Sequence, residues 1–346
     1  MKRLRKQGLK QLGEFGLISR FHSILEYRSP QTVLGLGDDC AAYQPEPGLL
    51  QVLSTDCLVE GIHFTLKTHL PEILGQKALA VNLSDIAAMG ATPKLALISL
   101  AIPNDMSVDF LDRFYKGLNR ISKKYKVDLA GGDTVSSPRD FFINISILGE
   151  AKKNRLFTRK GAKAGDRIFV TGTLGDSSLG LEILNNPRKK WRGPISHRKT
   201  LIQKHLCPEP RIAFSQKLAR SKLKITSMID ISDSLGQDLE HICIESGVGA
   251  DIRENCLPGS EALTKFCFIN KLDPFNYILS GGEDYELLFT MAPEHVKKID
   301  ALLKTTDLPV KSIGEVTGNP RTINVIGESG ISRTLQKPAG FDHFQR

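Results

Sequence analysis

The chain has 346 residues, of which 40% are hydrophobic and 25% charged, a composition typical of a globular protein large enough for two domains. It contains no run of 18 apolar residues, and no apolar segment or cleavage site follows the basic N-terminus, so we expect a cytoplasmic protein without a membrane span or secretory signal. The formal net charge of +9 leaves open a nucleic acid, a polyanionic small substrate or a simply solvated basic surface.

The first half of the chain interleaves strand-like and helix-like segments. Residues 71–91 and 108–125 carry apolar residues at the three- and four-residue spacing of an amphipathic helix. Apolar runs of strand length occur at residues 32–37, 49–55, 95–102, 127–132 and 141–149. This alternation predicts an α/β domain, which we place at residues 1–150.

A composition shift after Gly149 marks the expected start of a second α/β domain, residues 151–346. The basic, glycine-bearing stretch that follows is typical of a linker or an exposed hairpin. Proline and glycine within residues 186–210 indicate an irregular insertion or a loop-rich pair of helices. Further strands are expected at residues 167–172, 224–232, 285–291 and 310–316.

One face of the expected helix at 71–91 is apolar except for a single carboxylate. The residues that share this face are Leu74, Ala78, Val81, Asp85 and Ala88. Burial of an unpaired carboxylate is costly, so Asp85 needs a compensating partner. A salt bridge to an arginine or lysine and a cation held in a cleft are both consistent with this position.

Aspartates recur directly after apolar, strand-like segments. The motifs GLGDD, STD, AGGD and DISD contain Asp38, Asp39, Asp56, Asp133, Asp230 and Asp233. Because ligands of open α/β sheets bind beyond the carboxyl ends of the strands, we expect these side chains to converge with Asp85. Converging carboxylates need a neutralising cation, and an all-oxygen site suits Mg²⁺ shared with substrate phosphates. The constellation predicts magnesium-dependent phosphoryl transfer, whereas a solvated Asx turn is the alternative for the GLGDD motif taken alone.

Two glycine-rich turns are candidates for substrate contacts. Residues 170–184 read as a strand, a Gly/Ser/Thr-rich turn and a helix, and the N–H groups of such a turn can bind phosphate. A helix N-cap built around Asp176 and Ser177 is the alternative, since the segment is neither a Walker A loop nor a GxGxxG fingerprint. SGGEDYELLFT, at residues 280–290, is a second such turn and carries Glu283.

Basic residues cluster in the N-terminal tail and at residues 152–167 and 187–199. No helix-turn-helix, zinc finger or aromatic RNA-binding motif accompanies them, so we expect no nucleic-acid partner and keep nucleic-acid binding as the alternative from another class. The six cysteines form no C-x-x-C pair, which favours reduced thiols over a zinc site.

Ten motifs, collinear over nearly the whole chain, together resemble bacterial thiamine-monophosphate kinase, a family related to aminoimidazole ribonucleotide synthetase and selenophosphate synthetase. They are GLGDDCA, STDCLVEGIHF, KALAVNLSDIAAMGA, LAGGDT, TRKGAKAGD, VTGTLGDSSLGL, IDISDS, SGGEDYELLFT, IGEVT and GFDHF. The resemblance implies a two-domain α/β (α+β) fold of the aminoimidazole ribonucleotide synthetase type, with the N-terminal domain forming a homodimer and a C-terminal domain closing over a cleft. It implies that ATP and several Mg²⁺ ions bind there, and that the γ-phosphoryl group passes to thiamine monophosphate, giving thiamine diphosphate and ADP.

The resemblance also implies roles for individual residues. The implied magnesium ligands are Asp39, Ser54, Thr55, Asp56, Asp85, Asp133, Asp230 and Asp233, of which Asp56, Asp133 and Asp233 are expected to be catalytic. The implied ATP contacts are Tyr115, Gly132, Asp133, Arg159 and Ser232. The implied thiamine monophosphate contacts are His63, Glu283 and Phe341, and an aromatic ring such as that of Phe341 can attract the cationic thiazolium.

Two features depart from the family pattern. Ser234 stands where the family motif ISDG has glycine, and if that backbone needs a positive φ, serine costs about 1 kcal/mol or more. An inactive family member is therefore an alternative. A basic extension before GEFGLIS (residues 13–19) is expected to be a mobile tail.

Other ATP-dependent enzymes of the superfamily are the runner-up interpretation. A selenophosphate synthetase is expected to carry a reactive cysteine near its N-terminus, whereas the first cysteine here is Cys40. A hydrogenase maturation factor is expected to end in a functional cysteine, whereas this chain ends in HFQR. An aminoimidazole ribonucleotide synthetase would lack the STD…EGIHF and GFDHF motifs.

Overall fold

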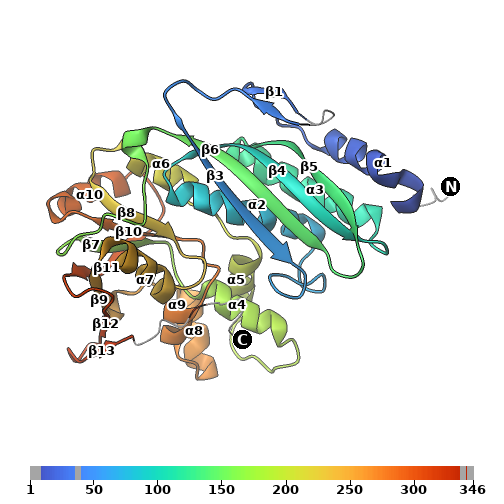
Figure 1. Ribbon diagram of the computed structural model, residues 1–346. Coiled ribbons are helices and arrows are strands. Elements are labelled where there is room, and N and C mark those ends of the chain that lie inside the picture. The colour runs from blue at the N-terminus through green and yellow to red at the C-terminus, as the bar shows by residue number, and fades with distance from the viewer. Residues whose placement is uncertain (1–8, 36–39, 336–339, 341–346) are drawn as a thin grey trace. The chain divides into compact units, whose positions relative to one another are not determined.

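The computed structural model describes residues 9–35, 40–335 and 340, and the chain divides into two compact units. The first unit comprises Met1–Ile86 and Thr92–Lys153, and the second comprises Ala87–Ala91 and Asn154–Arg346. Each unit has its own sheet and its own helices (Figure 1). None of the helices in the described part of the chain has the length and apolarity that a bilayer span requires.

A four-stranded mixed sheet forms the first unit (Figure 1). In spatial order its strands are β3 (Leu50–Val59), β6 (Phe142–Ala151), β4 (Thr92–Pro103) and β5 (Asp128–Ser137). β6 pairs antiparallel with β3 and with β4, and β4 pairs parallel with β5. β3 and β5 are therefore opposite edges of the sheet, about 14 Å apart at the usual strand spacing.

Two helices of the first unit, α2 (Pro71–Ala88) and α3 (Val108–Tyr125), form where the apolar periodicity predicts helices. The Oγ atom of Ser107 accepts the N–H of Phe110 at 3.1 Å and caps the start of α3, while Lys126 ends it in a left-handed conformation. β3 and α2 carry the STD motif and Asp85, while α3 and β5 carry Tyr115 and the AGGD motif.

The helices α2 and α3 cross in backbone contact. A Cβ atom added to Gly75 on α2 would overlap the carbonyl oxygen of Phe114, and one added to Gly117 on α3 would overlap that of Glu72. Close to this crossing, the guanidinium of Arg113 forms an ion pair with Glu72 at 2.7 Å. The two glycines thus fix how closely α2 can approach α3.

Three smaller elements precede this sheet in the chain. They are α1 (Leu9–Ile24), β1 (Thr32–Leu34) and β2 (Ala42–Tyr43), and β1 pairs antiparallel with β2. The backbone of α1 is non-helical at Gly13, where φ is 64°. Beyond that break, the ring of Phe21 stacks on the ring of Tyr115 with 3.8 Å between the centroids. This contact helps to join α1 to α3.

A seven-stranded sheet forms the second unit. In spatial order its strands are β13 (Ser332–Thr334), β12 (Ile323–Ile326), β9 (Gly249–Arg253), β11 (Val310–Thr317), β7 (Arg167–Thr171), β10 (Leu287–Met291) and β8 (Ile225–Asp230). All neighbours pair antiparallel except β12 and β9, which are parallel. A mostly antiparallel sheet differs from the parallel arrangement on which the expected convergence of aspartates was based.

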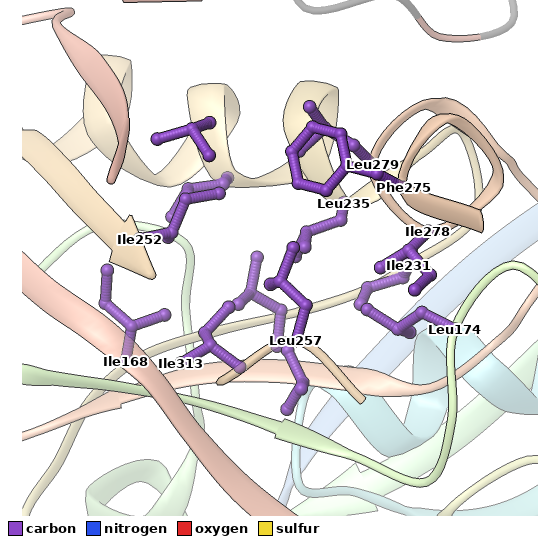
Figure 2. Packing of buried hydrophobic residues seen from close by; sticks show 14 of the residues in the cluster. Ile168, Leu174, Ile231, Leu235, Ile252, Leu257, Phe275, Ile278, Leu279 and Ile313 are labelled. Atoms are coloured by element: carbon purple, nitrogen blue, oxygen red, sulfur yellow. The ribbon is translucent and has the colours of Figure 1, made fainter. Parts of the chain in front are cut away.

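Helices of the second unit accompany this sheet, and most of them contribute side chains to one apolar core. They are α4 (Asp176–Asn185), α5 (Ile195–Leu206), α6 (Ile212–Arg220), α7 (Leu235–Ser246), α8 (Glu261–Asn270), α9 (Pro274–Ser280) and α10 (Val296–Leu303). Figure 2 shows Ile168, Ile252 and Ile313, from three strands, in one cluster with Leu235 of α7 and Phe275 of α9. The core fixes the start of α7, next to which the DISD motif lies. The stretch 186–210 contains one helix, α5, preceded by irregular chain.

Candidate active site

Two carboxylates and a hydroxyl meet on the first unit, between β3 and α2. The hydroxyl of Ser54 donates a hydrogen bond to the carboxylate of Asp85, and Asn82 Oδ1 accepts the backbone N–H of Asp56 at 3.2 Å. Burial, together with the nearby charge of Asp85, raises the pKa of Asp56 to about 6. Hard oxygen donors that repel one another in a partly buried site suit a divalent cation such as Mg²⁺.

The aspartates of the STD and AGGD motifs were expected at strand ends, and this is wrong. Asp56 lies inside β3 and Asp133 inside β5, because both strands continue with residues that pair fully with their neighbours. These strands are the two edges of the sheet, so a single copy of the unit does not bring Asp133 together with Asp56. The expectation that all the aspartates of one chain converge beyond parallel strands fails for this mixed sheet.

Thr55 lies between Ser54 and Asp56, but its hydroxyl makes different contacts. It hydrogen-bonds the carbonyl of Ile145 at 3.2 Å and accepts the Nδ2–H of Asn144 at 2.9 Å. Side chains alternate between the two faces of a strand, so the hydroxyl of Thr55 is on the face away from its two neighbours. The structure therefore groups Ser54 with Asp56 and separates the side chain of Thr55 from them.

Three implied ATP contacts lie together on the first unit. Tyr115, Gly132 and Asp133 line one small pocket of about 50 Å³, beside Phe21 and Ile98. Gly132 has φ 153°, and a Cβ atom there would overlap the carbonyl oxygen of Ile98, so this position requires glycine. A pocket of this size holds little more than water, and it is far below the roughly 300 Å³ at which small-molecule sites begin.

The remaining implied contacts of the first unit and of the termini are placed as follows. His63 lies in the turn after β3, and its Nδ1 accepts the N–H of Val59 at 3.0 Å, which fixes the orientation of the ring. Asp39 and Phe341 lie outside the described residues, as does Asp38.

The second unit brings the DISD and SGGED motifs side by side. The N–H of Glu283 donates to the carbonyl of Ser232 at 2.7 Å. A Cβ atom on Gly282 would lie 2.6 Å from the carbonyl oxygen of Asp233, so glycine permits this close approach. Asp230 ends β8, as the sequence predicts, and is only 4% exposed. The motifs that contain Asp230, Ser232, Asp233 and Glu283 therefore lie next to each other.

Glu283 is held in an uncommon backbone conformation. Its φ is 62°, a value that non-glycine residues rarely adopt and that is often found at functional sites. Its carboxylate lies 3.1 Å from Nδ1 of the buried His205. Nothing about the pattern HLCPEPR around His205 had singled it out beforehand. Arg159, an implied ATP contact on the same unit, has an exposed side chain.

The turn at 173–177 had two predicted roles, and neither is observed. The N–H groups of Gly175 and Ser177 donate to the carboxylate of Asp284 at 2.7 and 3.3 Å, so they are already occupied and do not form an open phosphate cradle. The N-cap of α4 is Gly175 and not Asp176. Burial raises the pKa of Asp284 well above its usual range. The turn is therefore an anchor that ties α4 to the SGGED loop.

A cavity of about 480 Å³ adjoins this anchor within the second unit. Ser177 and Asp284 line it, together with Lys204 and Arg211. The guanidinium of Arg211 pairs with the buried carboxylate of Glu286, with its Nε 2.6 Å from Oε2. The volume is in the range of small-molecule sites, and the wall carries charges of both signs.

Ser234 adopts an extended conformation that any residue can take. Its φ is 174° and its ψ 160°. The Oγ atom of Ser234 accepts the N–H of Gln237 at 3.1 Å and caps α7. Serine is a preferred N-cap residue, so the departure from the family glycine carries no backbone strain.

Besides His205, two further residues of the site were missed in the sequence. Asp238 is 2% exposed, and its pKa is raised to about 7 by burial and by the charge of Asp233. Ligand atoms of Asp233, Asp238 and His241 lie within 4.8 Å of one another. Asn82, which accepts the N–H of Asp56, is the other. Both residues occupy helix faces that turn toward a motif, but polar residues on helices are too common for this to have identified them.

Comparison with known proteins identifies both halves of the chain. Residues 37–151 match the AIR synthase related protein N-terminal domain, and residues 163–326 match the C-terminal domain of the same family. The chain is 40% identical over 340 residues to thiamine-monophosphate kinase of Escherichia coli K12, covering 96% of this chain and 98% of the relative. It is 39% identical over 335 residues to the enzyme of Buchnera aphidicola subsp. Schizaphis graminum, covering 96% and 99%.

Solved structures give the same result. The thiamine-monophosphate kinase of Stenotrophomonas maltophilia superposes with a TM-score of 0.80 at 32% identity, covering 91% of this chain and 97% of that one. AaThiL complexed with AMPPCP and TMP superposes with a TM-score of 0.75 at 37% identity, covering 97% and 98%. The hydrogenase maturation protein HypE, at 19% identity and a TM-score of 0.72, shares the fold.

Proposed function

The chain belongs to the thiamine-monophosphate kinases of the AIR synthase related family, and from this premise we propose that it transfers the γ-phosphoryl group of ATP to thiamine monophosphate. The products are thiamine diphosphate and ADP. The observation that carries the proposal is the match over 97% of the chain to a relative that binds an ATP analogue and TMP together.

We propose that the oxygen cluster of Ser54, Asp56 and Asp85 binds Mg²⁺. The donors are all hard, and burial beside the charge of Asp85 raises the pKa of Asp56, so a cation that neutralises both carboxylates would be favoured here. These residues would hold Mg²⁺, and the ion would supply positive charge to offset the negative charge that develops during transfer. Asp230 and Asp233 supply a second oxygen-rich group on the other unit. Asp39, Thr55 and Asp133 are further proposed ligands. The hydroxyl of Thr55 lies on the other face of β3 and Asp133 lies on the opposite edge strand, so neither side chain joins the first cluster within one copy of the chain.

The nucleotide contacts proposed are Tyr115, Gly132, Asp133, Arg159 and Ser232. The shared pocket of Tyr115, Gly132 and Asp133 supports this grouping, although the pocket must widen before it admits a base. The attacking group of thiamine monophosphate is already an anionic phosphate oxygen, so the site needs no strong general base. Positioning and charge neutralisation are therefore the main tasks of these residues.

For thiamine monophosphate we propose contacts with His63, Glu283 and Phe341. Glu283 supports this role through its constrained backbone and its position next to Asp284, which lines the 480 Å³ cavity. Its carboxylate supplies an opposing charge for the cationic substrate.

We also propose a homodimer that forms through the N-terminal domain, residues 1–150, with the C-terminal domain, residues 151–346, completing the substrate site. Leu53, Leu97 and Val135 expose 71%, 38% and 51% of their surface on three strands of the four-stranded sheet. Side chains alternate between the two faces of a strand, and the register of the sheet puts Leu53, Leu97 and Val135 on the face opposite the buried isoleucines of β6. They offer an apolar surface for a second copy. Because the co-substrate is ATP, we place the reaction in the cytoplasm.

The test is a product assay with purified protein, ATP, Mg²⁺ and thiamine monophosphate, followed by chromatography. We expect thiamine diphosphate and ADP in equal amounts, no reaction without Mg²⁺, and none with thiamine as acceptor. Asp56→Asn and Asp133→Asn are expected to lower turnover by at least about 100-fold, as for the loss of a group that stabilises transition-state charge. ADP formed without thiamine diphosphate would refute the proposed acceptor and favour another enzyme of the superfamily.

A further inference from the structure

One buried carboxylate holds the whole DISD loop. Oδ2 of Asp238, on the first turns of α7, accepts three consecutive backbone N–H groups. They belong to Ser232, Asp233 and Ser234, at 3.1, 3.2 and 3.2 Å. Successive N–H groups that point at one anion form a concave nest, and the anion here is built into the chain.

The side chain of Asp233 is held by the same turn of α7. Nε2 of Gln237 donates to Oδ2 of Asp233 at 3.0 Å. Ser234 caps the helix, so the loop cannot rotate freely about its junction with α7. Asp238 thus fixes the backbone of Asp233, and Gln237 fixes its carboxylate.

We propose that Asp238 is a positioning residue that orients Asp233 and Ser232 toward the magnesium–nucleotide complex. This inference rests on the proposed function. One oxygen of Asp238 accepts all three N–H groups, whereas an asparagine amide would bring an additional N–H donor into a site that already contains three, so it would hold the loop less firmly. Partners that orient a metal ligand typically change metal affinity 10–100-fold when they are replaced.

A direct role of Asp238 as a metal ligand is the competing explanation, because Asp238, Asp233 and His241 lie close together. The three hydrogen bonds favour a positioning role, since they show Oδ2 of Asp238 bound to backbone N–H groups. His241→Ala separates the two explanations, because positioning does not depend on the imidazole.

The chain provides a matched control in Asp166. This aspartate is 3% exposed, lies in the same unit and also anchors a turn, with its Oδ2 accepting the N–H of Lys163 at 2.9 Å and the hydroxyl of Thr226 at 2.7 Å. Asp166→Asn therefore removes a buried anchoring charge without touching the DISD loop.

The experiment compares Asp238→Asn with Asp166→Asn. The readouts are the melting temperature without Mg²⁺, the half-saturating Mg²⁺ concentration for activity, and Mn²⁺ binding measured by electron paramagnetic resonance with a non-hydrolysable ATP analogue. We expect both variants to melt a few degrees lower. Only Asp238→Asn should raise the half-saturating Mg²⁺ concentration, by about tenfold, and weaken Mn²⁺ binding to a similar degree. The KM for thiamine monophosphate should stay within twofold in both.

An unchanged Mg²⁺ requirement and unchanged Mn²⁺ affinity in Asp238→Asn would overturn the positioning role. Loss of one bound Mn²⁺ in His241→Ala would overturn it in favour of direct coordination. If Asp238→Asn does not fold, Gln237→Met tests the same idea at a partly exposed residue, and we expect a two- to threefold rise in the Mg²⁺ requirement, with no change counting against the proposal. Wild-type protein that makes no thiamine diphosphate would instead refute the proposed function, and the Mn²⁺ comparison would still test the loop.

Discussion

The hydroxyl of Ser54 on β3 donates a hydrogen bond to the carboxylate of Asp85 on α2. This contact joins a sheet edge to a helix and places Asp85 close enough to Asp56 to disfavour the ionisation of that carboxyl. Asp85, the one carboxylate on the apolar face of α2, thus lies next to the sheet. A bound cation would balance the charges of Asp85 and Asp56.

The stability of the metal-free protein should fall as the pH rises through about 6. The pKa of Asp56 is about 6 in the folded state, above its usual value of 3.8, so the protonated carboxyl favours folding and its ionisation does not. The contribution is present below pH 4 and is lost as the pH passes 6, and it amounts to at most about 3 kcal/mol at 1.36 kcal/mol per pKa unit.

Thermal melts in a chelator at pH 5 and pH 7.5 measure this effect in the wild type and in Asp56→Asn. We expect the asparagine variant to lose part of the pH dependence and to melt higher than wild type at pH 7.5. Mg²⁺ should stabilise the wild type more than the variant. Identical pH profiles for the two proteins would show that the ionisation of Asp56 does not cause the loss of stability.

Ser234→Gly, which restores the family residue, should not raise activity. The serine backbone is extended and its hydroxyl caps α7, so glycine removes a cap and relieves no strain. We expect kcat within about twofold of wild type and a stability loss of a few tenths of a kcal/mol, against about 1 kcal/mol for Ser234→Ala. Steady-state kinetics and urea melts measure both. A large gain in kcat for the glycine variant would support the inactive-member alternative.

Glu283→Gln should affect thiamine monophosphate and not ATP. The substitution keeps the side-chain shape but removes the charge that opposes the cationic substrate. We expect the KM for thiamine monophosphate to rise about tenfold, the equivalent of one charge-assisted contact of roughly 1.4 kcal/mol, while the KM for ATP stays within twofold. Phe341→Ala should show the same pattern. A change confined to the KM for ATP would assign these residues to the nucleotide.

Leu53→Asp should weaken the proposed dimer. The side chain is 71% exposed on an edge strand, so the monomer tolerates a charge there, whereas an apolar interface does not. We expect sedimentation equilibrium to show monomers for the variant and dimers for the wild type at the same concentration. Leu70→Asp is the control, since Leu70 is 58% exposed but lies just before α2 and not on the sheet. Dimers of both variants would exclude this face as the interface.

Patterns of apolar and polar residues within one element made part of the fold and of the site predictable. Residues 108–125 form a helix over the predicted range because an apolar stripe and a serine cap agree. Asp85 stood out because a carboxylate interrupts an apolar stripe, and it does face Ser54 and Asp56. What the residues could not reveal is pairing over long sequence separations. The mixed order of the sheet places Asp133 and Asp56 at opposite edges, and alternation along β3 takes the hydroxyl of Thr55 away from its neighbours.

The DISD loop shows the same limit at closer range. The motif was recognised, but its anchor Asp238 lies in a helix whose polar residues have no distinctive spacing. The extended backbone at Ser234 could not be predicted from the sequence either. The glycine of the family motif does not reveal whether φ is positive at this position. Hydrogen bonds to the backbone decide both points, and only the folded structure shows them.

The crossing of α2 and α3 has a consequence for how this protein can vary. Gly75 lies ten positions before Asp85, yet a Cβ atom there would overlap the carbonyl oxygen of Phe114, so the two helices would have to move apart. A shift of α2 would lengthen the distance between the side chains of Asp85 and Ser54. The geometry of the two carboxylates therefore depends on a position with no side chain, and Gly75→Ala, a type of substitution often used to raise stability, should here reduce catalysis.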